Sequence, residues 1–273
     1  MDQNDLIEEI VGRLHGDPDL RALFLGGSLG RSEGDRFSDV DLIAVVEAEA
    51  HEGFVARWRS LLDGIAPVVF WNTRQGASTL VNAVTSHWLR CDLFVVAPDR
   101  LGQRARATVI PLVDPSRLFD KLPERLPERP PNADRIRFLI NEFLRVHGLL
   151  TVVVGREEHL TAVQGSGLLR DMLIELMQED ARLPDRDGAL HLSRVLPGED
   201  MATLLDLPSP GPDRQEVIDA HLAIAAAFLP RAKRMAGELG LDWPEDFEAA
   251  TRRHLNRELG LYAGQAEDAP SAP

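Results

Sequence analysis

The sequence is poor in cysteine and lysine, and each shortage excludes a class of protein. A single cysteine, Cys91, excludes an internal disulfide framework and any zinc site built from cysteines. The chain has two lysines, Lys121 and Lys233, and a formal net charge of −14. Binding of nucleic acid through its phosphates requires clustered Lys and Arg, so we expect no nucleic-acid partner. The negative charge either attracts a cationic small molecule or only keeps the protein soluble.

Long hydrophobic runs are also missing from the sequence. The nearest approach to one, residues 222–229, is far too short to span a membrane. The first ten residues are acidic, where a secretory signal peptide would be basic and then apolar. We therefore expect a cytoplasmic protein with no membrane partner. The sequence holds no P-loop lysine motif, dinucleotide fingerprint or HExxH motif, and it leaves the oligomeric state open.

Residues 1–115 alternate helical and strand patterns. Apolar residues at helical spacing predict helices over 5–15 and 48–62. Short apolar runs predict strands over 22–25, 41–46, 67–71, 80–85 and 88–96. These elements predict an α+β domain, in which a mixed β-sheet is flanked by helices.

A proline-rich, charged segment over 116–132 is typical of a stiff, exposed connector. Beyond it, residues 133–262 predict a helical domain, followed by a flexible tail over 263–273. The helices are expected over 134–154, 167–179, 215–239 and 245–258. Pro230 should kink or end the third of these helices.

Two aspartates separated by one residue open the strand predicted over 41–46. Side chains at positions i and i+2 of a strand point the same way, so Asp39 and Asp41 face one spot. Like charges held this close raise each other's pKa unless a cation lies between them. The apolar residues that follow supply no cation. We therefore expect a divalent metal ion here, and Mg²⁺ is usual where carboxylates meet substrate phosphates.

A glycine-rich turn precedes this aspartate pair. Gly26, Gly27 and Gly30 let backbone amides approach a ligand closely, and consecutive exposed N–H groups form an anion-binding concavity. Ser28 adds a hydroxyl and Arg31 a fixed charge, both suited to phosphate oxygens. Alternatively, Ser28 holds the turn and Arg31 is a surface arginine. A phosphate-binding turn beside a metal-binding pair is what metal-assisted phosphoryl or nucleotidyl transfer needs.

The spacing of these residues resembles the signature of a known superfamily. Gly27-Ser28, ten intervening residues and Asp39-x-Asp41 are similar to the pattern of the nucleotidyltransferases, which include polymerase beta and the antibiotic nucleotidyltransferases. That pattern implies a third carboxylate on a later strand. Asp92 lies in a suitable apolar strand, although it can instead pair with Arg90.

The resemblance implies a nucleotidyltransferase-type sheet joined to a helical domain, as in enzymes that adenylylate aminoglycosides or lincosamides. It implies that Asp39, Asp41 and Asp92 hold Mg²⁺ and are the catalytic carboxylates. It also implies that ATP lies along the turn of Gly27 and Ser28 while an acceptor hydroxyl attacks the α-phosphate and pyrophosphate leaves. Asp92 can take the proton of that hydroxyl.

The helical domain offers candidate acceptor-binding residues but no motif. Glu142 and Arg145 interrupt a strongly apolar helix and pair either with each other or with a ligand. Asp171 and Glu175 share one helix face, which either binds a cationic substrate or is simply solvated. We predict a small, cationic, hydroxyl-bearing acceptor held between the two domains.

Two other functions fit parts of the sequence. A protein- or RNA-modifying nucleotidyltransferase of the antitoxin type would use the same acids, although the acidic balance disfavours RNA. A non-catalytic nucleotide-binding protein would keep the fold, but the retention of three acids argues against it. The resemblance therefore implies Mg²⁺-dependent transfer of a nucleoside monophosphate, AMP from ATP, to an aminoglycoside- or lincosamide-like antibiotic.

Overall fold

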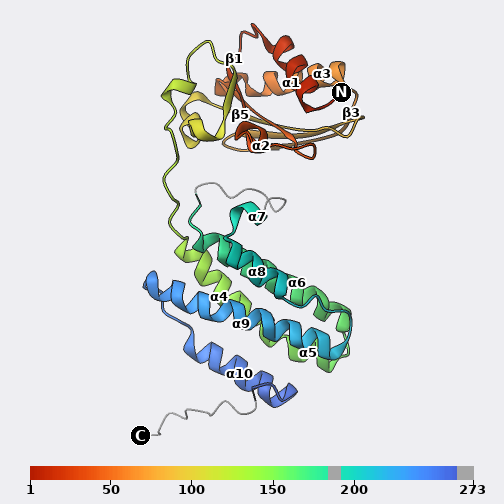
Figure 1. Ribbon diagram of the computed structural model, residues 1–273, viewed down its shortest axis with the longest axis vertical. Coiled ribbons are helices and arrows are strands. Elements are labelled where there is room, and N and C mark those ends of the chain that lie inside the picture. The colour runs from red at the N-terminus through yellow and green to blue at the C-terminus, as the bar shows by residue number, and fades with distance from the viewer. Residues whose placement is uncertain (184–191, 263–273) are drawn as a thin grey trace. The chain divides into compact units, whose positions relative to one another are not determined.

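The computed structural model describes residues 1–183 and 192–262 (Figure 1), so the tail predicted over 263–273 lies outside the described residues. The chain divides into two compact units, Met1–Pro127 and Glu128–Pro273. The division falls inside the proline-rich segment. The beginning of that segment belongs to the first unit, because Leu118, Phe119 and Leu122 pack against one of its hydrophobic clusters.

The first unit contains a six-stranded mixed sheet with the strand order β3-β4-β5-β2-β1-β6. Strands β2 and β5 run parallel, and the other neighbouring strands run antiparallel. The strands are β1 (Leu20–Leu25), β2 (Val40–Val46), β3 (Val68–Gln75), β4 (Thr79–Thr85), β5 (Arg90–Val96) and β6 (Ile110–Val113). The α+β class expected from the sequence is confirmed.

Helices cover one face of this sheet. Helices α1 (Gln3–Leu14) and α3 (His51–Ile65) place their apolar sides, with Leu6, Ile10 and Trp58, in one hydrophobic cluster with every second residue of the central strands. On the opposite face, a smaller cluster packs over β1, β2 and part of β5. The remaining elements of this unit are α2 (Gly27–Gly30) and the 3₁₀ turns η1 (Ala48–Ala50), η2 (Pro98–Gln103), η3 (Arg106–Thr108) and η4 (Phe119–Lys121).

The second unit is helical, as the sequence predicts. Its helices are α4 (Ala133–Gly148), α5 (Leu150–Gly155), α6 (His159–Asp180), α7 (Leu192–Val195), α8 (Gly198–Asp206), α9 (Arg214–Glu238) and α10 (Glu245–Leu259). Phe143 of α4 stacks on Phe228 of α9 in the main core, with ring centroids 3.8 Å apart. Pro230 does not end α9, because the buried residues on both sides of it hold the helix against the core.

Helices α4 and α5 together have the length and apolar composition of a membrane span. The stretch Ala133–Gly155 has a mean hydropathy of 1.4 over its most apolar window, and 50% of that window is buried inside the protein. The core helix of a helical bundle has the same composition, because its apolar face packs on neighbouring helices. A single helix of this kind is weak evidence for a membrane.

Candidate active site

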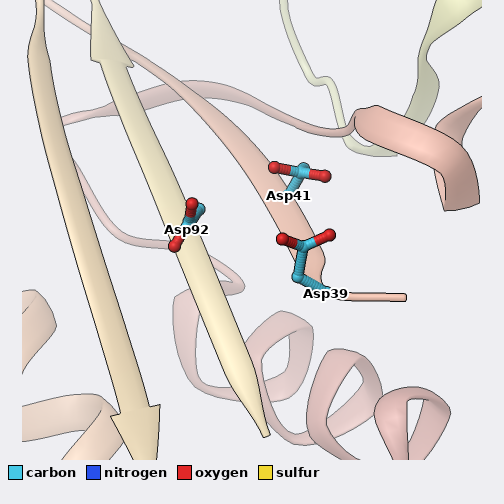
Figure 2. Close-up of side chains that lie close together, drawn as sticks. All are labelled: Asp39, Asp41 and Asp92. Carbon is cyan, nitrogen blue, oxygen red and sulfur yellow. The ribbon is translucent and has the colours of Figure 1, made fainter. Parts of the chain in front are cut away.

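Three carboxylates converge on one face of the sheet. Asp39 precedes β2, Asp41 lies within it, and Asp92 is the register partner of Asp41 on the parallel strand β5. One oxygen of each carboxylate lies within 4.8 Å of the other two. Figure 2 shows the three side chains on the same side of these adjacent strands. The structure therefore brings together the three acids that the sequence singled out.

The glycine turn lies directly against this cluster. Gly27 begins the single turn α2 at a positive φ of 58°, and a Cβ atom placed on it would lie 1.8 Å from Oδ2 of Asp41. Only glycine therefore fits without displacing the carboxylate. The backbone N–H of Gly26 donates to the carbonyl of Asp41 over 2.7 Å. These contacts fix the turn beside β2.

The two polar side chains predicted for this turn have partners within the unit. Ser28 is buried, and its hydroxyl donates to Oγ of Ser38 over 2.8 Å, which joins the turn to the residues before β2. Arg31 lies with Nε 3.2 Å from a carboxylate oxygen of Glu33. The charge of Arg31 also acts on Asp41, where it opposes a rise in pKa. Both side chains thus lie at the carboxylate cluster, and whether they bind phosphate stays a prediction.

The carboxylates are partly buried and repel one another. Burial, followed by the charges of Asp39 and Asp92, raises the pKa of Asp41 to about 7. Burial also raises the pKa of Asp92, against the effect of a hydrogen bond from Asn82. A cation among the three groups would reverse this balance, because it favours their charged forms. Clustered carboxylate oxygens are the ligands that Mg²⁺ and Mn²⁺ prefer, so the donor set fits such an ion.

Two residues that contact these acids, Asn82 and Arg90, belong to no recognisable motif in the sequence. Nδ2 of Asn82, the register partner of Asp92 on β4, donates to Oδ2 of Asp92 over 2.7 Å. The sequence left open an ion pair between Arg90 and Asp92. In the structure Arg90 pairs with Asp39 instead, and its Nη1 atom lies 3.7 Å from Oδ2 of Asp39. The only available signal for Asn82 was a polar residue inside an alternating apolar strand.

Arg90 also lines a cavity of about 330 Å³. Nη2 of Arg90 donates to the carbonyl of Phe37 over 2.7 Å, and Nε2 of Gln3 donates to the carbonyl of Ser38 over 3.1 Å. These bonds hold the loop that connects the glycine turn to β2. The residues lining the cavity are Gln3, Arg36, Phe37, Ser38, Trp88, Leu89 and Arg90.

The candidate acceptor residues of the second unit lie on two helices. Glu142 and Arg145 of α4 form a two-bond ion pair with distances of 2.5 and 2.8 Å. Glu175 of α6 accepts two bonds from Arg135, at 2.5 and 2.6 Å, and Asp171 is exposed one turn before it. The two glutamates thus already have positively charged partners. A role for these four predicted residues in acceptor binding stays a prediction.

Comparison with known proteins finds similarity in structure alone. No protein-family model matches the chain, and no curated protein matches its sequence. The chain is similar to the aminoglycoside 6-adenyltransferase from Bacillus subtilis, with 16% identity, a TM-score of 0.45, and coverage of 92% of this chain and 95% of that chain. It is also similar to the nucleotidyltransferase-like protein from Exiguobacterium sibiricum 255-15, with 14% identity, a TM-score of 0.39, and coverage of 93% and 87%.

Proposed function

We propose that the protein is a nucleotidyltransferase that requires a divalent metal ion and moves AMP from ATP to a hydroxyl group of a small molecule. The observation that carries the proposal is the juxtaposition of three carboxylates within 4.8 Å with a turn at which Gly27 cannot bear a side chain. A carboxylate cluster of this kind, which can hold a divalent metal ion beside a backbone turn, suits a substrate with several phosphates.

Each part of the site has a distinct task in this reaction. Asp39 and Asp41 would hold Mg²⁺, which supplies Lewis acidity at the phosphates when bound. The turn from Gly26 to Gly30 would receive the phosphate chain, with Ser28 and Arg31 beside it. Asp92, which the amide of Asn82 orients, would contribute to the metal site and accept the proton of the attacking hydroxyl.

The acceptor in this proposal is a small hydroxyl-bearing compound of the aminoglycoside or lincosamide kind. The chain has two lysines and a net charge of −14, which disfavours an RNA acceptor. The alternatives are transfer to a protein, or nucleotide binding without reaction. Glu142, Arg145, Asp171 and Glu175 remain candidates for contact with the acceptor.

Pyrophosphate release from ATP and Mg²⁺, with and without a panel of aminoglycosides and lincosamides, tests this function. We expect release that depends on both the metal and one class of acceptor. The variant Asp41→Asn, which keeps the side-chain volume, should abolish the release. Label transfer from α-phosphate-labelled ATP to protein would favour the protein-modifying alternative. Nucleotide binding without release under all conditions would contradict enzymatic transfer.

A further inference from the structure

The carboxylate cluster continues into an exposed polar part of the sheet. Strand register places Asn72 of β3 opposite Asn82 of β4, and Asn82 opposite Asp92 of β5. Asp92 is in turn opposite Asp41 of β2. Because partners in register share a face, these polar residues form one row across four strands.

This face of β3 is exposed. Trp71 packs on the cluster that α1 and α3 cover, so its neighbours in sequence point to the other side of the sheet. On that side, Asn72 and Arg74 are exposed, and 51% of the Phe70 surface is accessible. The smaller hydrophobic cluster on this side contains residues of β1, β2 and β5 but none of β3 or β4.

The glycine turn lies on the other flank of the carboxylates. Its helix α2 contacts β1 and β2, and a Cβ atom on Gly30 would meet the carbonyl oxygens of Leu25 and Thr108, at 2.5 and 2.9 Å. If the phosphates of ATP occupy this turn, the leaving pyrophosphate lies on the β1 side. In-line displacement requires the attacking hydroxyl to approach from the opposite side. That side is the one formed by Asp92, β4 and β3.

Arg74 places a positive charge on the β3 part of this face, next to the carboxylates. Arg74 makes no ion pair within the part of the chain that the structure describes. It lies near enough to Asp92 for its charge to oppose the rise in the pKa of that carboxyl. An ammonium group placed beside Arg74 would be repelled, whereas a neutral hydroxyl or an anionic oxygen would be accepted.

We propose that the acceptor lies on the face formed by Asn72, Arg74 and Asn82, and that its groups beside Arg74 are neutral or anionic. This inference rests on the proposed function and narrows its substrate class. The acceptor is a sugar-like polyol without ammonium groups on the side that faces Arg74, so a lincosamide or a sugar phosphate fits and a polycationic aminoglycoside does not. In the transfer, the acceptor oxygen bonds to the α-phosphorus, the bond to the bridging oxygen breaks, pyrophosphate leaves with that electron pair, and the hydroxyl proton passes to Asp92.

Charge reversal on this face tests the inference independently of turnover. Calorimetry would measure the binding of lincomycin, glucose 6-phosphate and kanamycin to the full chain, loaded with Mg²⁺ and the unreactive analogue α,β-methylene-ATP. We expect kanamycin to bind most weakly to the natural protein. Arg74→Glu should weaken the binding of glucose 6-phosphate by about tenfold or more and strengthen that of kanamycin.

The matched control is Arg59→Glu on α3. Arg59 lies over the ring of Trp71 at 5.4 Å, on the helix-covered face of the same strand, so the net charge changes equally but away from the carboxylates. Arg59→Glu should change the affinity for each of the three probes by no more than about twofold relative to the natural protein. Three results would overturn the proposed acceptor surface. They are that kanamycin binds most tightly, that no probe binds, or that the two variants have equal effects. If the three probes bind as expected but no pyrophosphate is released when ATP replaces the analogue, the proposed reaction is overturned instead.

Discussion

Nδ2 of Asn82 donates a hydrogen bond of 2.7 Å to Oδ2 of Asp92 from the neighbouring strand. This bond holds the Asp92 carboxylate from one side, while one of its oxygens lies within 4.8 Å of oxygens of Asp39 and Asp41. The orientation of the third acid is therefore set by β4, a strand that carries no recognisable motif. Positioning groups of this kind restrict a reactive side chain to its productive geometry.

Loss of this bond should affect the chemical step. In Asn82→Ala, Asp92 loses its orienting donor, so we expect kcat to fall by about ten- to a hundredfold while the KM for ATP changes little. Steady-state kinetics would separate the two constants. An equal change in both, or an unchanged kcat, would contradict a positioning role for Asn82.

The repulsion within the cluster predicts that removing one charge stabilises the metal-free protein. The pKa of Asp41 is raised to about 7, so above that pH the folded protein holds an ionised carboxylate that burial and the neighbouring acids destabilise. At pH 8, Asp41→Asn should raise the free energy of unfolding by about 2 kcal/mol, since a pKa unit corresponds to about 1.4 kcal/mol and partial exposure weakens the effect. Denaturant unfolding without metal measures this change. The same variant should lose the stabilisation that Mg²⁺ gives the natural protein, and a destabilised variant would contradict the account.

A pair of glycine variants separates backbone strain from the collision with Asp41. Gly27 and Gly16 both have positive φ, 58° and 84°, but nothing lies within 4 Å of a Cβ atom on Gly16. Both Gly→Ala changes should cost about 1 kcal/mol of stability through strain. Gly27→Ala alone should also weaken Mg²⁺ binding, because the new methyl group displaces the Asp41 carboxylate. Calorimetric titration with Mg²⁺ would reveal the difference, and unchanged binding in Gly27→Ala would show that the turn does not fix the metal site.

His147 of the second unit should make stability depend on acid pH. Burial lowers the pKa of its imidazole to about 3, with smaller effects from His221 and Arg252. The unfolded chain binds a proton near the ordinary value of 6.5, whereas the folded chain does not. Its contribution to stability is therefore complete above pH 6.5 and is lost towards pH 3, by up to about 1.4 kcal/mol per pH unit.

Denaturant unfolding between pH 7 and pH 4 tests this dependence. His147→Leu should flatten the slope, although it loses the hydrogen bond that His147 Nε2 shares with the Tyr262 hydroxyl over 3.0 Å. His87→Leu changes an exposed side chain and should keep the natural slope. An unchanged slope in His147→Leu would show that other groups cause the acid sensitivity.

The convergence of Asp39 and Asp41 could be predicted from sequence because it depends only on the two-residue period of a strand. The approach of Asp92 to this pair was predicted only through the resemblance to a known superfamily. Local sequence does not reveal it, because the parallel pairing of β2 and β5 joins segments about fifty residues apart. The contacts of Asn82 and Arg90 depend on strand register and loop path, and neither is encoded locally.

Two elements differ from the sequence prediction for reasons that lie in packing. Helix α6 begins at His159 and not near 167. Its first turns are held by tertiary packing, because Ala162 is buried in a hydrophobic cluster with residues of α5 and α9. Strand β6 contains Pro111, which favours a connector in sequence but is tolerated at the edge of a sheet, where β6 lies.

The most direct test of the metal site is anomalous diffraction from crystals grown with Mn²⁺ and α,β-methylene-ATP. Mn²⁺ takes the same oxygen ligands as Mg²⁺ and scatters anomalously. We expect a peak between the carboxylates of Asp39, Asp41 and Asp92, about 2.2 Å from the oxygens that bind it, with the phosphates against the turn at Gly27. A nucleotide bound elsewhere, or bound here with no metal peak among the three carboxylates, would contradict the account.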